Sequence, residues 1–188
     1  VAVAESLGGT IINADSMQIY RELSVLTARP DAGAEARALH RLFGVVSAGE
    51  RCSAARWQAM ALAEIAICHA AGRLPIFVGG TGLYVKALID GLASIPPIAP
   101  EVRSRARDRR AAIGAEAFHA EVALRDPAAA GRIAPGDTQR VLRAWEVFEA
   151  TGRALSDWHA HSHERRRHAF DVFATLLAPP RAALYAAC

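Results

Sequence analysis

The sequence predicts an α/β fold in which a parallel sheet is flanked by helices and carries an all-helical insertion. Short runs rich in β-branched residues at 10–13 and 74–78 alternate with helical segments, which is the pattern of parallel strands joined by crossover helices. Over 94–169 this alternation gives way to Arg- and Ala-rich sequence with helical spacing. We therefore expect an α/β core over 1–93 and 170–188, and a helical lobe over 94–169.

Composition narrows the class of protein further. Of the 188 residues 52% are apolar, which suffices for a buried core, but 42 are Ala, which favours helix over strand. No apolar run approaches the roughly 20 residues of a membrane span, so no membrane partner is expected. The three cysteines show neither the spacing of a zinc site nor a disulfide framework. We expect a cytoplasmic protein with no metal ligands in this chain.

Caps and apolar spacing mark the elements of the α/β core. Residues 1–7 are predicted to end a helix that Gly8 closes, and residues 10–13 to form a buried strand. Ser53 is a capping residue for a helix over 54–71, whose apolar positions recur every three or four residues. These signals predict that helices and buried strands alternate along the core.

The insertion and the chain after it carry similar signals. Asp137 can cap a helix that ends before Gly152. Residues 170–177 are predicted to form a strand that returns to the sheet, and Pro179 and Pro180 to open another helix. Because elements are interrupted at both ends of the chain, we expect a fragment of a longer protein.

Candidate chemistry lies at the carboxyl ends of the two strands, where ligands bind in open α/β sheets. Asp15 and Ser16 follow the first strand, and a carboxylate there can act as a general base, hold a metal ion, or only cap the next helix. Residues 79–82, Gly-Gly-Thr-Gly, follow the second strand. They allow a close backbone approach and offer amides to a phosphate, or they serve turn geometry alone.

The positive charge of the chain is concentrated in arginine. Of 22 basic residues only Lys86 is a lysine, and arginines cluster at 103–110 and 165–167. Such clusters are typical of solvated helix faces, but they also suit a polyanionic partner. No Gly-x-x-x-x-Gly-Lys-Ser/Thr phosphate loop occurs in the sequence. Because that loop joins the first strand and the first helix of its fold, we expect it upstream of Val1.

Three motifs resemble those of the tRNA dimethylallyltransferases, also called tRNA isopentenyltransferases or the IPP transferase family. Residues 14–21 are similar to the family's Asp-Ser-x-Gln-x-Tyr-Arg, 78–84 to Gly-Gly-Thr-Gly-Leu-Tyr, and 137–146 to Asp-x-Gln-Arg-x-x-Arg-Ala-x-Glu. The sequence departs from the family pattern at two places. Residues 39–42, Leu-His-Arg-Leu, stand where the family has a His-His-Leu segment, and Arg29 stands where Lys is common. The resemblance implies a P-loop NTPase-like fold, and a chain that lacks the family's N-terminal phosphate loop and C-terminal third.

The resemblance also implies transfer of a dimethylallyl group from dimethylallyl diphosphate to the N6 amine of the adenine 3′-adjacent to the anticodon of tRNA. The lone pair of this amine is delocalised into the ring, so a base that takes its proton helps, and Asp15 is the candidate. Mg²⁺ is implied for the departing diphosphate, with its phosphate-loop ligand upstream of this chain. We expect a monomer whose helical lobe grips the anticodon stem and loop, and no activity from this chain by itself.

By resemblance, the tRNA contacts are spread over both parts of the chain. They are predicted at Asp15, Ser16, Met17, Gln18, Thr81, Arg103, Gln139, Arg140, Val141, Leu142 and Arg143. Two other functions stay open on the sequence. One is a P-loop kinase of a small molecule, which would consume ATP and ignore tRNA, and the other is a non-catalytic RNA-binding module.

Overall fold

Three parallel strands form the centre of the structure, a computed structural model that describes residues 1–162 and 171–187. β1 (Gly9–Asn13) lies between β2 (Leu39–Arg41) and β3 (Leu74–Val78). All of β1 is buried, as expected for a central parallel strand, and it pairs with β3 along its whole length. The α/β class predicted from the alternation of elements is therefore confirmed.

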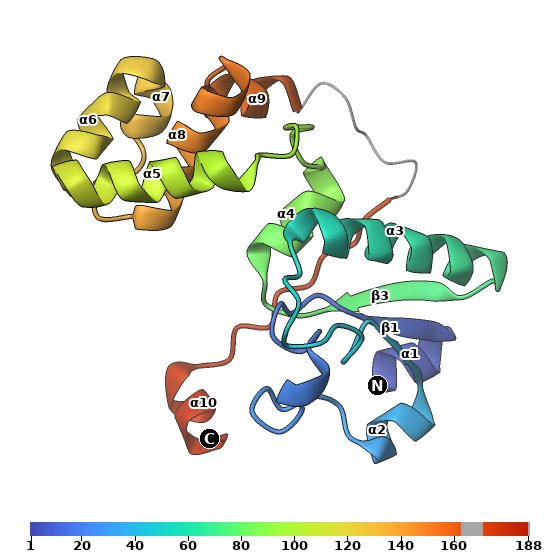
Figure 1. Cartoon of the computed structure of the whole chain (residues 1–188). Helices are drawn as coiled ribbons and strands as arrows, with labels where there is room; N and C mark the ends of the chain where they lie inside the picture. The colour runs from blue at the N-terminus through green and yellow to red at the C-terminus, as the bar shows by residue number, and fades with distance from the viewer. Residues whose placement is uncertain (163–170, 188) are drawn as a thin grey trace.

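Helices cover both faces of the sheet (Figure 1). α3 (Ala54–Ala70) lies on one side of the strands, and α1 (Ala2–Leu7) and α2 (Ala32–Arg37) lie on the other. α4 (Gly82–Asp90) follows β3 and packs against α3. The central strand is thus covered on both faces, whereas the outer strands β2 and β3 are partly exposed.

Aromatic side chains fill the core between β1 and α3. Trp57 is fully buried and its ring stacks on Tyr84, with centroids 4.4 Å apart and planes 10° from parallel. The Trp57 indole N–H donates a 2.8 Å hydrogen bond to the carbonyl of Asn13, the last residue of β1. Burying a large side chain stabilises by about 1.5–3 kcal/mol. α3 is therefore fastened to the sheet at the point where the strand ends.

The predicted caps are present. Gly8 adopts a left-handed conformation with φ 60° at the end of α1, and the Ser53 hydroxyl accepts from the Arg56 amide at the start of α3. α2 and β2 were not predicted. The carboxylate of Asp31 caps α2 by accepting from Ala34, a signal present in the sequence. β2 is three residues long, and pairing with β1 rather than apolar spacing defines it.

The insertion folds into a helical lobe with a core of its own. Its helices are α5 (Pro100–Ile113), α6 (Ala115–Arg125), α7 (Pro127–Ala130), α8 (Thr138–Thr151) and α9 (Leu155–Ser162). Phe118, Val141 and Val147 are fully buried at their centre. Asp137 caps α8 and Gly152, with φ 67°, ends it, as predicted. Figure 1 shows the lobe beside α4 and apart from the three strands.

The prediction of a strand over 170–177 is wrong. Residues 171–180 form no strand, and Phe173 and Leu177 are exposed on their surface, while Phe170 lies outside the described residues. Apolar, β-rich composition favours a strand only where a neighbouring edge supplies backbone hydrogen bonds, and no described strand supplies them here. α10 (Arg181–Ala187) begins directly after Pro180, as predicted. The cluster at 165–167 lies outside the described residues.

A buried carboxylate joins two helices of the lobe. Asp126 is 1% exposed, and its carboxylate oxygens accept hydrogen bonds from the amides of Ala129 in α7 and Ser156 in α9, each 2.9 Å long. Burial opposes ionisation, but the hydrogen bonds from Ser156 and Ala129 outweigh it and hold the pKa of Asp126 below its ordinary value. The ionised form is therefore part of the native lobe.

We predict that Asp126→Asn lowers the free energy of unfolding by about 1–3 kcal/mol near neutral pH, because an amide replaces an acceptor between two donors. Since the folded pKa is depressed, the carboxylate stabilises above its ordinary pKa of 3.8 and loses this effect as the pH falls through the folded value. Urea denaturation of both proteins at neutral and acidic pH measures the difference. Asp108→Asn, on the exposed surface of α5, is the control. A difference that stays constant down to the acidic pH would contradict the role of the ionised form.

Candidate functional site

Two loops meet at the carboxyl edge of the sheet. One follows β1 and the other follows β3, and hydrogen bonds run from the Ala14 amide to the Val78 carbonyl (2.8 Å) and from the Thr81 amide to the Ala14 carbonyl (3.2 Å). A Cβ on Gly79 would lie 2.6 Å from the Asp15 nitrogen, too close for any side chain. Gly79 is therefore required by the approach of the two backbones, which is the geometric interpretation left open by the sequence.

Asp15 stands at the tip of the first loop. One carboxylate oxygen, Oδ1, accepts from the amides of Met17 (2.7 Å) and Gln18 (3.3 Å) and so closes a turn. The other oxygen, Oδ2, accepts no hydrogen bond from any residue in the described ranges. Capping and chemistry were alternatives on the sequence, and the geometry allows both, because one oxygen orients the group and the other is available.

Thr81 connects the second loop to the first. Its hydroxyl oxygen accepts from the Ser16 amide at 2.9 Å, and its hydroxyl donates to the Ser16 hydroxyl at 3.3 Å. The Asp-Ser and Gly-Gly-Thr-Gly motifs are therefore one structural unit, although they lie 65 residues apart. Two hydroxyls therefore meet at the residue that follows Asp15.

The next two motif residues differ in role. Met17 is exposed, whereas Gln18 donates from its side-chain amide to the Thr27 carbonyl at 2.9 Å and, more weakly, to the Ala28 carbonyl. Ala28 has φ 48°, which is rare for a residue with a side chain. The Gln18 amide group thus holds the loop that follows η1 (Arg21–Leu23) in a defined conformation.

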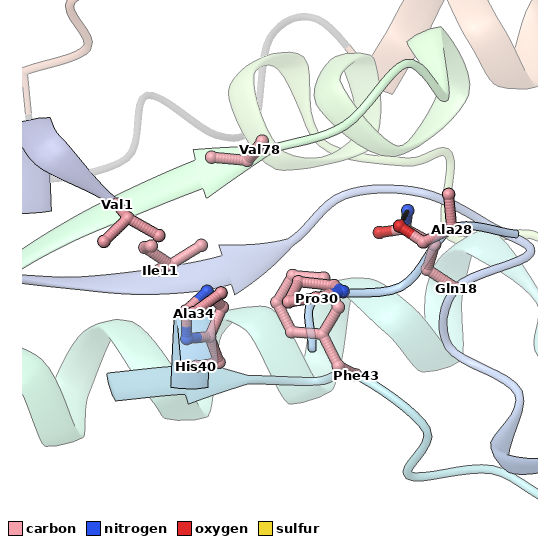
Figure 2. Close-up of a pocket in the computed structure, with 9 residues that line it drawn as sticks. All are labelled: Val1, Ile11, Gln18, Ala28, Pro30, Ala34, His40, Phe43 and Val78. Atoms are coloured by element: carbon pink, nitrogen blue, oxygen red, sulfur yellow. Dashed lines mark hydrogen bonds between the residues drawn. The ribbon is translucent and has the colours of Figure 1, made fainter. Parts of the chain in front are cut away.

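A pocket of about 290 Å³ borders this unit (Figure 2). Ile11 and Val78 of the sheet and Phe43 form much of its apolar lining, on the sheet face opposite α3. Gln18 and His40 supply polar groups. The pocket is therefore mainly apolar, and it shares Gln18 with the loop that carries Asp15.

Two residues beneath the loops, Asn13 and Tyr84, were not among the predicted site residues. The Asn13 side chain is fully buried and hydrogen-bonds the backbone of Asp15. The Tyr84 hydroxyl is buried and has no hydrogen-bond partner among the described atoms. Burial and then the Cys52 thiol raise the pKa of Tyr84 well above its ordinary value, which keeps the phenol neutral. The sequence contained one signal that could have identified Asn13, since it is a polar residue at the end of a strand predicted to be buried.

The remaining predicted contact residues lie in the lobe, on α5 and α8. Arg103 is in the first turn of α5, while Gln139 and Arg140 are exposed at the start of α8. Val141 is fully buried and Leu142 packs against the lobe core. These two side chains hold α8 in place, and the Val141 amide donates to the Asp137 carbonyl at 3.0 Å.

Arg143 is the half-buried member of this group. Burial lowers the pKa of its guanidinium most; the Glu146 carboxylate opposes this change, and the positive charge of Arg103 adds to it. Within the described ranges, neither Arg103 nor Arg143 forms an ion pair. Two neighbouring cations beside the single Glu146 carboxylate leave this surface of the lobe with an excess of positive charge, which suits an anion.

Four of the eight other arginines in the described part of the lobe form ion pairs. Those at 105 and 125 pair with Glu149, the one at 109 pairs with Glu121, and Arg140 pairs with its own cap residue Asp137. Exposed pairs of this kind contribute little to stability, but they reduce the charge that a partner meets. Arg103 and Arg143 thus differ from the four paired arginines, and within the described residues they share the lack of an ion pair with the arginines at 107, 110, 132 and 153.

The described residues do not fit Mg²⁺ as they stand. In 1–162 and 171–187 no three His, Cys, Asp or Glu side chains gather as metal ligands. Mg²⁺ takes about six oxygen ligands in near-octahedral geometry, whereas Asp15 offers one available carboxylate oxygen and two hydroxyls that already bond each other. The chemistry assigned to this chain below therefore involves its own side chains alone.

Comparison with known proteins places this geometry in a family. A family model described as IPP transferase matches residues 18–188. A tRNA dimethylallyltransferase of Rhodospirillum centenum is 53% identical over 186 residues, which are 99% of this chain and 59% of that protein. The chain belongs to the IPP transferase family. A second tRNA dimethylallyltransferase, from Rhodopseudomonas palustris strain CGA009, is 51% identical over 98% of this chain and 57% of its own length.

The IPP transferase fold is also found among solved structures. A eukaryotic dimethylallyltransferase acting on tRNA superimposes with a TM-score of 0.70 at 24% identity, covering 84% of this chain and 39% of that chain. This likeness confirms the predicted α/β fold, a parallel sheet with flanking helices. The chain spans somewhat more than half the length of the curated IPP transferases that it matches.

We predict that Gly79→Ala lowers the free energy of unfolding by about 1–3 kcal/mol, because the added Cβ meets the backbone of Ala14 and Asp15, which the sheet holds in place. Gly80→Ala is the matched control, since a Cβ at Gly80 would have no atom within 4 Å. Urea denaturation followed by tryptophan fluorescence measures both variants. Equal effects at the two positions would show that the glycines matter for chain flexibility and not for the contact between loops.

Proposed function

We propose that the complete protein containing this chain transfers a dimethylallyl group from dimethylallyl diphosphate to the N6 amine of the adenine 3′-adjacent to the anticodon in tRNA. One observation carries the proposal. The Asp15 carboxylate is oriented by two backbone amides through Oδ1 and presents Oδ2, with Ser16 and Thr81 beside it, at the ligand-binding edge of an IPP transferase sheet.

Asp15 acts as general base in this proposal. The N6 nitrogen forms a bond to C1 of the dimethylallyl group, the C1–O bond to the diphosphate breaks, and the bonding pair leaves with the diphosphate. The proton of N6 passes to Oδ2 of Asp15, which restores a neutral amine. A base already oriented by Met17 and Gln18 needs little rearrangement for this transfer.

The tRNA is proposed to contact both parts of the chain. The target adenine must leave the anticodon stack to reach a buried edge, so polar groups must hold it and its neighbours. Residues 15–18 and Thr81 are placed at that edge, and the lobe over 94–169 would grip the stem and loop through phosphate charge. Among its residues Arg103 and Arg143 are the best supported, because they are neighbouring cations and neither forms an ion pair within the described residues.

The departing diphosphate needs positive charge that the described site does not supply. The sequence has one lysine and no Gly-x-x-x-x-Gly-Lys-Ser/Thr segment. We therefore propose that Mg²⁺ and its ligands lie outside this chain in the complete protein, which we expect to act as a cytoplasmic monomer. In the part of the chain that the structure describes, every helix is too short or too polar to cross a bilayer.

We predict that Asp15→Asn in the complete protein lowers kcat by about 10²- to 10⁴-fold, because the variant keeps the turn but cannot take a proton. Single-turnover transfer from labelled dimethylallyl diphosphate, read by nucleoside mass spectrometry, measures the rate. Asp31→Asn is the matched control, because Asp31 also caps a turn through its carboxylate but belongs to α2. Near-normal kcat for Asp15→Asn would leave Asp15 as a cap only.

The same assay separates the alternatives. Consumption of ATP with a small acceptor and no tRNA modification would indicate a kinase. Binding of tRNA without any modification would indicate a non-catalytic RNA-binding module.

We further predict that Arg143→Gln or Arg103→Gln lowers the slope of log tRNA affinity against log salt by roughly 0.7 to 0.9, the value expected for one lost phosphate contact. Arg109→Gln is the control, since the guanidinium of Arg109 is already paired with Glu121. Filter binding of tRNA at several salt concentrations measures the slopes. An equal change in all three variants would mean that the lobe attracts tRNA only by diffuse charge.

A further inference from the structure

The amide side chain of Asn13 is a buried polar group, and two of its three hydrogen bonds go to Asp15 of the candidate site. Asn13 is the last residue of β1 and is 0% exposed. Burying an amide costs free energy unless its donors and acceptor form hydrogen bonds. The groups that Asn13 bonds therefore indicate which part of the structure it stabilises. Here the partners belong to the loop that carries the proposed base and to the chain after β2.

Both backbone groups of Asp15 are bonded to this one side chain. The Asn13 oxygen accepts from the Asp15 amide at 2.8 Å, and its NH₂ group donates to the Asp15 carbonyl at 2.9 Å. The two peptide planes that flank Asp15 are therefore held from the same point. Because the Cα–Cβ bond direction follows from these two planes, the bonds restrict where the Asp15 carboxylate can point.

Asn13 is itself anchored on two sides. Its NH₂ group also donates to the carbonyl of Leu42 at 3.1 Å, and its own carbonyl accepts from the Trp57 indole at 2.8 Å. Leu42 follows β2 in a left-handed conformation with φ 63°. Asn13 thus connects the sheet, the chain after β2 and the aromatic core to Asp15, and both Leu42 and Trp57 are buried.

We infer that Asn13 is a positioning residue for the Asp15 carboxylate. Its proposed role involves no contact with substrate; it holds the Asp15 backbone so that Oδ1 accepts from the Met17 and Gln18 amides, while Oδ2 accepts no hydrogen bond from the described residues. This inference rests on the proposed function, because it presumes that Asp15 takes a proton. A misplacement of about 1 Å can reduce the rate of a positioned reaction by roughly 100-fold.

Asn13→Ala in the complete protein tests the inference. The expected result is a fall in kcat of about 10- to 100-fold, with KM for dimethylallyl diphosphate and for tRNA within about twofold of the wild type. Asn13→Ser is the conservative variant, because a serine hydroxyl can accept from the amide two residues onward, and it should recover part of the lost kcat. Should Asn13→Ala fail to fold, the serine variant carries the test through its kcat alone.

Gln58→Ala is the matched control. Gln58 is also a buried amide, but it donates to the Ala87 carbonyl and joins α3 to α4 away from Asp15. It is expected to lower thermal stability while kcat of the folded protein stays within about twofold of the wild type. Both variants lose hydrogen bonds of a buried amide. A difference in kcat between them therefore reflects the positioning of Asp15 and not a general loss of stability.

The double variant with Asp15→Asn separates positioning from a structural role. If Asn13 acts through the Asp15 base, Asn13→Ala adds little further loss once that base is gone. The same fold loss of kcat in both backgrounds, or an unchanged kcat in Asn13→Ala alone, would overturn the inference. A wild-type protein that leaves tRNA unmodified would instead overturn the proposed function, so the two failures are distinguishable.

Discussion

Hydrogen bonds between β1 and β3 continue past the ends of both strands, from Ala14 to Val78 and from Thr81 back to Ala14. This extension keeps the two loops in backbone contact, and Gly79 permits it because a Cβ there would meet Asp15. Once the backbones are this close, the Thr81 hydroxyl reaches Ser16 without any further rearrangement. The site is thus a consequence of parallel strand pairing, which brings the carboxyl ends of both strands to one edge.

Beneath the loops, buried aromatic and amide groups give the site a stiff support. Trp57 packs on Tyr84 and bonds Asn13, and Asn13 in turn bonds Asp15. Each of these groups is buried, so its hydrogen bonds face little competition from water and its rotamers are restricted by packing. A carboxylate that ends such a chain of contacts can be exposed to a ligand and still hold a defined direction.

In the helical lobe, charged side chains are stabilised by ion pairs on the surface and by hydrogen bonds in the interior. Ion pairs to Glu121 and Glu149 neutralise arginines on α5 and α6, whereas Arg103 and Arg143 remain as neighbours of the same sign. Asp126 fixes the packing of α7 against α9 with its buried carboxylate. A stable scaffold with a local excess of positive charge suits a polyanion better than a uniformly charged surface, because few contacts then carry most of the attraction.

The sequence by itself determined what depends on local signals. Gly8, Ser53 and Asp137 cap helices where predicted, the buried run at 10–13 is the central strand, and the motifs around Asp15 and Thr81 identified the edge and the family. Only the tertiary structure decided what depends on partners distant in sequence. The run at 171–177 has strand composition but no strand pairing, the arginines differ by their counter-ions, and Asn13 shows its role only through its bonds to Asp15 and Leu42. A helix cap depends on residues a few positions apart, so it can be predicted from the sequence. Strand pairing, ion pairs and buried hydrogen bonds join residues distant in sequence, so they are known only once the chain is folded.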